Sequence, residues 1–147
     1  MSQDKSINEY SFGIIPARKV GGDYYFLLVH RLEGFWELPK GHAEEDEDDI
    51  EAAKREFSEE TGLQKVNILK DSIFENKYIY ERDDEVIHKV VKYYIGLVPE
   101  GEEVRVQKDE VDDYTWAPFE EARRIITHQN SRELLDKAFE ALEENYK

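Results

Sequence analysis

The chain has 147 residues, a formal net charge of −15 and no cysteine. This length suits a single domain over residues 1–147, and the lack of cysteine excludes disulfide and thiol chemistry. Hydrophobic residues make up 39% of the chain, but no apolar run approaches the roughly 20 residues of a membrane-spanning helix. We therefore expect a cytoplasmic monomer without membrane contact, and the acidic balance argues against a general nucleic-acid binder.

In chain order, the first predicted elements are two strands and a helix. Residues 1–8 are polar and predicted to be loosely held. The elements that follow are a strand at 10–17, a turn at 21–23, a strand at 24–31, a loop at 32–42 and a helix at 48–61. In this helix Ile50, Ala53 and Phe57 form the apolar stripe, and Gly62 supplies a C-terminal stop.

The second half of the chain predicts further strands and then two helices. The expected elements are strands at 66–71, 73–81 and 85–98, a short edge strand at Val104 and Val106, and a strand at 112–117. Pro118 opens a helix at 119–127, and Ser131 caps a last helix that runs to about Asn145. Strands before and after a central helix predict an α/β (α+β) fold, an α/β/α sandwich around a mixed sheet.

Residues 41–63, the box segment, carry a dense pattern of glycine and acidic residues. Its fixed positions are Gly41, Glu47, Arg55, Glu56, Phe57, Glu59, Glu60, Gly62 and Leu63. Glu56, Glu59 and Glu60 lie three and four residues apart, so a helix places them on one face, beside its apolar stripe. Like charges this close destabilise a helix unless a cation neutralises them, and Mg2+ prefers carboxylate oxygens. The spacing favours a magnesium site over the alternative, an exposed acidic helix with scattered charges.

This pattern resembles the box of the Nudix hydrolases, and the resemblance covers about residues 9–140. It implies that Glu56 and Glu60 are the principal ligands of Mg2+, for which Mn2+ can substitute. Glu59 would bind the metal directly or through water, and a backbone carbonyl near Lys40 or Gly41 would complete the cage. The fold that the resemblance implies is the same α/β/α sandwich.

The resemblance also implies a reaction, the attack of water on a phosphorus of a diphosphate linkage. In this reading Glu56 and Glu59 take part in catalysis, and Arg55 holds a glutamate in its rotamer. Family members often place a base on the loop before a late strand, and the matching stretch here is 109–116. We select Glu110 in this stretch, with Glu102 and Glu103 as rival candidates nearby.

Outside the box segment, the chain resembles the asymmetrical dinucleoside tetraphosphate hydrolases, which act on diadenosine tetraphosphate. The run Trp36-Glu37-Leu38-Pro39-Lys40-Gly41-His42 resembles the tryptophan…Pro-Lys-Gly-His run of that group. Lys40 and His42 would then meet the polyphosphate, although His42 could also simply cap its loop. The implied partner is a dinucleoside polyphosphate or another nucleoside diphosphate-linked small molecule.

Aromatic residues beyond the box segment extend this resemblance. Tyr78 and Tyr80 stand where such hydrolases tend to carry a tyrosine, and residues 89–94 resemble the strand that supplies a lysine for phosphate and a tyrosine for adenine. Lys89 would be that lysine. Because side chains alternate along a strand, only one of Tyr93 and Tyr94 faces the ligand, and we select Tyr93. Stacking on such a ring contributes about 1–3 kcal/mol.

Three alternatives remain open at this stage. The run Glu37-Leu38-Pro39 also resembles ADP-ribose pyrophosphatases, although those usually continue with Ala-Gly. RNA 5′ pyrophosphohydrolysis is a second alternative, and a nucleotide-sensing module without hydrolysis is a third. One departure from the tetraphosphate hydrolases is Phe35, where that group often has histidine. A phosphate or acid contact of the group is then missing here.

Overall fold

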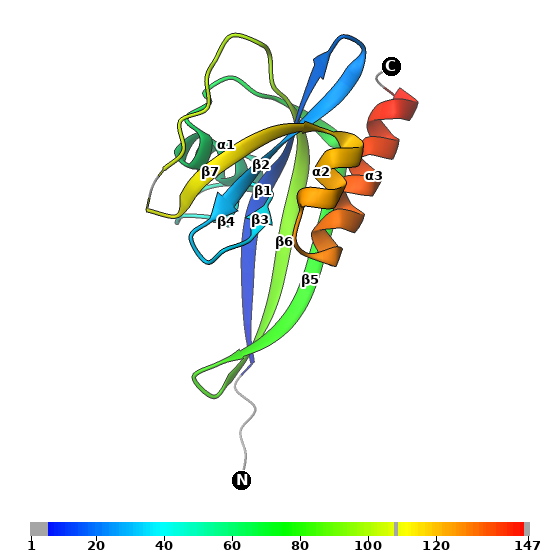
Figure 1. Cartoon of the computed structure of the whole chain (residues 1–147). Helices are drawn as coiled ribbons and strands as arrows, with labels where there is room; N and C mark the ends of the chain where they lie inside the picture. Colours follow the sequence, from blue (N-terminus) through cyan, green and yellow to red (C-terminus); the bar gives the residue numbers. More distant parts are fainter. Residues whose placement is uncertain (1–5, 108, 146–147) are drawn as a thin grey trace.

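The computed structural model describes residues 6–107 and 109–145 (Figure 1). Within these residues, seven strands form one mixed sheet in the order β3-β2-β1-β6-β5, with β4 paired to β1 and β7 paired to β2. The strands are β1 (Ser6–Val20), β2 (Asp23–Arg31), β3 (Trp36–Glu37), β4 (Lys40–His42), β5 (Asn67–Arg82), β6 (Glu85–Leu97) and β7 (Val111–Pro118). Only β1 and β6 are parallel among the described pairs.

Helices cover both faces of this sheet. They are α1 (Asp49–Thr61), α2 (Phe119–Ile125) and α3 (Gln129–Asn145). On one face α1 packs Ala53 and Phe57 against Ile14 and Leu27. On the other face α2 and α3 pack against the sheet (Figure 1). The strand side chains that they contact point away from α1, because successive residues of a strand face opposite sides of the sheet. The predicted α/β/α sandwich around a mixed sheet is confirmed.

Both ends of helix α1 have residues suited to their positions. Asp48 is the N-cap, and its Oδ1 accepts the backbone N–H of Glu51 at 2.8 Å. Gly62 follows the last turn with φ +75°, a left-handed conformation that glycine adopts without strain, and its N–H donates to the Ser58 carbonyl at 2.8 Å. The predicted helix and its stop are therefore observed, and the buried stripe includes Ala52 and Ala53.

Several predicted strands differ from the observed ones. The runs at 66–71 and 73–81 form one strand, β5, because an irregularity between Leu69 and Ile73 interrupts its register with β6 without ending it. The expected loop at 32–42 contains two short strands, β3 and β4. Residues 6–8, expected to be loose, are paired with β6, while residues 1–5 lie outside the described part of the chain.

The predicted edge strand at Val104 and Val106 is wrong. This segment instead crosses the C-terminal end of α1, where the Arg105 N–H donates to the Thr61 carbonyl at 2.7 Å. The Gln107 N–H reaches the Glu60 carbonyl at 3.4 Å. The segment therefore satisfies carbonyl groups that a helix end leaves without partners, rather than pairing with the sheet.

The predicted cap at Ser131 is also wrong, because α3 already begins at Gln129. Ser131 lies inside the helix and is only 2% exposed, on the side that packs toward the sheet. The preceding helix agrees better with expectation, since Pro118 is the N-cap of α2 and the helix begins at Phe119. Within the described residues, no helix is both long and apolar enough to cross a membrane.

Candidate active site

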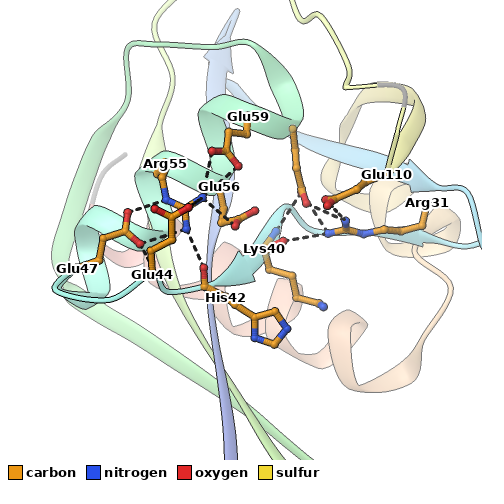
Figure 2. Close-up of polar contacts among 10 residues, drawn as sticks. Arg31, Lys40, His42, Glu44, Glu47, Arg55, Glu56, Glu59 and Glu110 are labelled. Atoms are coloured by element: carbon orange, nitrogen blue, oxygen red, sulfur yellow. Dashed lines mark hydrogen bonds and ion pairs between the residues drawn. The ribbon is translucent and has the colours of Figure 1, made fainter.

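The end of strand β2 places a buried arginine against helix α1. Arg31 and Glu60 are both buried, and the guanidinium donates to both carboxylate oxygens, from Nη1 to Oε2 at 2.8 Å and from Nη2 to Oε1 at 3.2 Å. Glu60 Oε1 also accepts the Lys40 backbone N–H at 3.2 Å, and Arg31 Nη2 donates to the Lys40 carbonyl at 3.3 Å. Arg31 therefore ties α1 to strand β4 (Figure 2).

Three glutamates form what we call the carboxylate cluster. Glu56, Glu60 and Glu110 each offer one oxygen, and these atoms all lie within 4.8 Å of one another. Helix α1 supplies Glu56 and Glu60, whereas Glu110 directly precedes β7 and its carbonyl accepts the Leu32 N–H at 3.1 Å. Arg31 Nη1 lies 4.0 Å from Glu110 Oε2. The cluster thus joins the box segment to a residue about fifty positions later.

The glycine of strand β4 makes room for this cluster. A Cβ atom built on Gly41 would overlap the carboxylate group of Glu56. Any other residue at this position would push the Glu56 side chain away from the backbone of β4. The glycine at the start of the box segment is therefore explained by the close approach of a helix carboxylate.

A second arginine, Arg55, lies on the more exposed side of α1. Its Nε and Nη2 donate to the two oxygens of Glu47 at 2.6 and 3.1 Å, and Nη2 also donates to the His42 carbonyl at 2.8 Å. Its Nη1 donates to Glu56 Oε1 at 3.1 Å and to both oxygens of Glu59 at 3.1 Å. Arg55 thus holds the loop before α1 and two of its glutamates together (Figure 2).

Glu59 does not join the carboxylate cluster. Its side chain is 49% exposed and is turned to Arg55, at the i,i+4 spacing that favours such pairs on a helix. Of the metal ligands predicted from sequence, the structure therefore brings Glu56 and Glu60 together and adds Glu110, but leaves Glu59 beside them. Glu102, a rival of Glu110, instead accepts the backbone N–H groups of Gln64 and Lys65 at 2.8 to 3.2 Å.

Burial makes the carboxylate cluster costly to charge. It raises the pKa of Glu60 to about 7, a shift that the attraction of Arg31 only partly offsets. Burial also raises the pKa of Glu56, against the lowering effect of Arg55. The pKa of Lys40 is lowered by burial and by the nearby Arg31. A further cation beside Glu56 and Glu60 would lower the pKa of both carboxyl groups again.

The donor set of the cluster fits a hard divalent cation. It offers three carboxylate groups on the described residues, and such oxygens are the ligands that Mg2+ and Mn2+ prefer. Glu110 is exposed, which leaves a side open to water and substrate. Glu56 and Glu60 would hold the cation from the helix side. The chain's own cations, Arg31 and Arg55, neutralise part of this charge but leave Glu110 without a hydrogen bond from either.

A cavity of about 380 Å³ opens next to Lys40, on the face of the sheet that α3 covers. Its lining includes Phe35, Glu37, Lys40, Asn76, Tyr78, Tyr93, His128 and Ser131. Three residues selected from sequence, Lys40, Tyr78 and Tyr93, therefore lie around one cavity. Tyr93 is only 1% exposed and forms part of its floor, whereas Tyr78 is 37% exposed and offers more of its ring. Tyr94 packs on the α1 face, as the alternation predicts.

The other predicted substrate residues do not line this cavity. The side chain of His42 is exposed, and its contact with Arg55 is made through the backbone carbonyl. Lys89 is buried, with its Nζ 4.0 Å from Glu9, and the Tyr80 hydroxyl donates to Glu9 at 3.0 Å. Lys89 is the cross-strand partner of Tyr78, and Tyr80 lies two residues further along β5. Both side chains contact the acidic Glu9 rather than the cavity.

Sequence reasoning missed two residues of this site, Arg31 and Glu37. Arg31 ends a strand and stands 29 residues before its partner Glu60, so no local spacing connects them. Glu37 was noted only as part of a motif, yet it is 5% exposed and lines the cavity. A charged residue inside an otherwise apolar strand end was the available signal for both.

The fold and the carboxylate cluster define an α/β/α sandwich whose first helix presents acidic ligands at the edge of a mixed sheet. Such a segment is the mark of one class of hydrolases that use divalent metals. Residues 8–138 match the NUDIX domain, and the chain belongs to the Nudix pyrophosphohydrolase family. The predicted resemblance to that family is thereby confirmed.

The relatives of the chain include tetraphosphatases and RNA pyrophosphohydrolases. The asymmetrical bis(5′-nucleosyl)-tetraphosphatase of Caenorhabditis elegans is 28% identical over 127 residues, covering 85% of this chain and 90% of the relative. An RNA pyrophosphohydrolase of Bartonella bacilliformis is 28% identical over 128 residues, covering 76% and 72%. The crystal structure of a C. elegans Ap4A hydrolase binary complex superposes with a TM-score of 0.80 at 28% identity, covering 92% of this chain and 98% of that one.

Proposed function

We propose that the protein is a Mg2+-dependent hydrolase that cleaves diadenosine tetraphosphate asymmetrically, to ATP and AMP. The observation that carries this proposal is the carboxylate cluster of Glu56, Glu60 and Glu110, beside a cavity that Lys40 and Tyr78 line. The likeness to tetraphosphatases over most of the chain supports the choice of substrate. Related dinucleoside polyphosphates would be cleaved in the same way.

In this proposal each charged group has a separate task. Glu56 and Glu60 hold the metal, which when bound neutralises phosphate charge and lowers the pKa of water. Glu110 is the only exposed member of the carboxylate cluster, and it accepts the proton of the water that attacks phosphorus. The phosphorus–oxygen bond of the anhydride then breaks, and the phosphate that leaves carries the negative charge. Lys40 lies where it can balance that charge.

The two arginines position these groups rather than touch the substrate. Arg31 fixes Glu60 through two hydrogen bonds, and Arg55 fixes Glu56 while it also binds Glu47. Residues that orient metal ligands in this way usually change metal affinity or activity by 10- to 100-fold when they are lost. Glu59 shares the Arg55 Nη1 group with Glu56, and in this proposal it contacts the metal through water.

RNA 5′ pyrophosphohydrolysis is the second candidate, because relatives with that name match most of the chain. The net charge of −15 weakens it, since a long polyanion would meet an acidic surface. ADP-ribose hydrolysis and nucleotide sensing rest on no observation of comparable strength in this structure. All of these alternatives can be compared in one experiment.

The test is a product analysis by chromatography with Mg2+ present. The substrates are diadenosine tetraphosphate, ADP-ribose, ATP and a 5′-triphosphorylated RNA. We expect ATP and AMP in equal amounts from the tetraphosphate, at a rate well above that of any other substrate. Two molecules of ADP per tetraphosphate, or faster release of pyrophosphate from RNA, would contradict the proposal. A parallel reaction with the Glu56→Gln variant measures any hydrolysis by contaminating enzymes, and this background is subtracted.

A further inference from the structure

Glu37 is a buried carboxylate that the proposed mechanism does not use. It lies in strand β3, is 5% exposed and forms part of the wall of the cavity beside Lys40. Its Oε1 accepts the backbone N–H of the next residue, Leu38, at 2.9 Å. Among the described residues, no lysine, arginine or histidine forms an ion pair with it. Arg31 and Lys40 attract this carboxylate through space, but Arg31 donates its hydrogen bonds to Glu60 and to the Lys40 carbonyl.

Such a carboxylate calls for a hydrogen-bond donor from a ligand. A buried charge without enough donors destabilises a protein, and a single backbone N–H leaves most of the acceptor capacity of Glu37 unused. The second oxygen, Oε2, has no partner within the described part of the chain. The side chain thus presents acceptor sites toward the cavity.

The rest of the cavity wall favours a flat ligand with polar edges. Tyr78 and Phe35 supply aromatic surface, and Tyr93 lies in the floor. Asn76 and Ser131 also line the cavity, and in the described residues neither side chain forms a hydrogen bond with protein. Ser131 is only 2% exposed, and its hydroxyl group can bond to a ligand in the cavity. Aromatic walls with one acceptor group and adaptable amide and hydroxyl groups are the features of a site for a heterocyclic base.

We propose that Glu37 determines base specificity, by accepting a hydrogen bond from the exocyclic amino group of a purine. Asn76 and Ser131 can then donate to the ring nitrogens of the same base. This inference rests on the proposed function, because it assigns one nucleoside of the substrate to the cavity. Adenine, which carries a 6-amino group, satisfies the carboxylate. Hypoxanthine carries a 6-keto oxygen instead, which would face another acceptor at the position where adenine offers a donor.

The test compares the binding of AMP and of IMP by calorimetry in the presence of Mg2+. The proteins are the unaltered chain, the Glu37→Gln variant and a control variant, Glu45→Gln, at an exposed acidic position in the loop before α1. We expect the unaltered chain and the control to prefer AMP by about tenfold or more. Glutamine retains an acceptor for the Leu38 N–H but offers an amide donor, so Glu37→Gln should lose this preference or reverse it.

Equal affinities of the unaltered chain for AMP and IMP would overturn the inference, as would an absence of binding of either nucleotide. A Glu37→Gln variant that weakens both nucleotides by the same factor would also overturn it, because that result indicates a structural role. Should the variant not fold, purine riboside 5′-monophosphate, which lacks the amino group, serves instead with the unaltered chain. It should bind at least about tenfold more weakly than AMP.

Measurements of hydrolysis distinguish a failure of this inference from a failure of the proposed function. An enzyme that cleaves diadenosine and diinosine tetraphosphate with equal kcat/KM would keep the proposed function and lose the role of Glu37. A chain that binds AMP over IMP through Glu37, but releases no ATP from the tetraphosphate, would keep the role of Glu37 and lose the proposed function.

Discussion

The two arginines beside helix α1 hold its carboxylates in different environments. Arg31 is 8% exposed and gives two hydrogen bonds to Glu60, which is fully buried. Arg55 has a side chain that is 22% exposed and shares its hydrogen bonds among Glu47, Glu56 and Glu59. One arginine thus makes a single buried pair, and the other makes a partly solvated network.

This difference distinguishes a contribution to folding stability from a contribution to metal binding, although both arginines contact glutamates of the same helix. A buried ion pair is costly to break, because the partner that remains is left charged and without water. An exposed pair contributes little to stability, since water and salt screen it. We therefore expect both arginines to matter for metal binding, but only Arg31 to matter strongly for folding.

The largest expected effect is a loss of activity on changing the carboxylate cluster, whose glutamates both arginines contact. Replacing Glu56 by glutamine removes a charged ligand but keeps the size of the side chain. We expect kcat for the best substrate to fall by about 10³-fold or more, because several kcal/mol of charge stabilisation are lost. Steady-state kinetics with Mg2+ measure this, and circular dichroism checks the fold. A variant that keeps a tenth of the activity would show that Glu56 does not hold the metal.

Loss of Arg31 should produce the second largest effect, and mainly in stability. In the Arg31→Met variant the buried Glu60 has no cationic partner, so the free energy of unfolding should fall by about 3–5 kcal/mol. Urea unfolding in EDTA measures this value. A change below 1 kcal/mol would mean that Glu60 is satisfied without Arg31. Mn2+ binding, followed by electron paramagnetic resonance, should weaken by about 10- to 100-fold.

The matched change at the other arginine should be weaker in stability but similar in metal binding. We expect Arg55→Met to lower the free energy of unfolding by less than about 1 kcal/mol, because its network is partly solvated. Mn2+ affinity should still fall by about 10-fold, since Glu56 and the loop before α1 lose their anchor. Equal destabilisation by the two arginine variants would contradict the distinction between a buried pair and an exposed network.

The smallest expected effect is a pH dependence of the metal-free protein. Burial raises the pKa of Glu60 to about 7 in the folded state, above its ordinary value of 4.5. The folded state therefore holds this proton more tightly than the unfolded state, so the contribution of Glu60 to stability is lost as pH rises through about 7. The Tm of the chain in EDTA should fall between about pH 5 and 8, relative to the Glu60→Gln variant. A parallel pH profile for the two proteins would contradict this assignment.

Much of the fold could be predicted from residue patterns. Runs of aromatic and β-favouring residues located much of β1, β2 and β6, and Asp48 with Gly62 marked the ends of α1. The errors arose where tertiary contacts override local pattern. Val104 and Val106 are β-branched but lie in a segment that caps α1, and the break at residue 72 hides one continuous strand. No local signal distinguishes these outcomes.

In the candidate site, too, local spacing could be predicted from the sequence, but contacts between distant residues could not. The spacing of Glu56 and Glu60 reveals that they share a helix edge, but not that Glu59 turns to Arg55. The charge of Arg31 at an apolar strand end was a signal, but its contact with Glu60 could not be predicted, because that contact depends on how β2 crosses α1. Lys40, Tyr78 and Tyr93 were foreseen and share a cavity, whereas Lys89 and Tyr80 lie around Glu9.

The most direct test of the account is a search for metal in crystals soaked with Mn2+. We predict an anomalous peak about 2.0–2.4 Å from carboxylate oxygens of both Glu56 and Glu60, with Glu110 facing it directly or through one water. The peak should be missing in crystals of Glu56→Gln that are soaked in the same way. An empty cluster in the unaltered chain at saturating Mn2+, or a peak held only by other residues, would contradict the central claim.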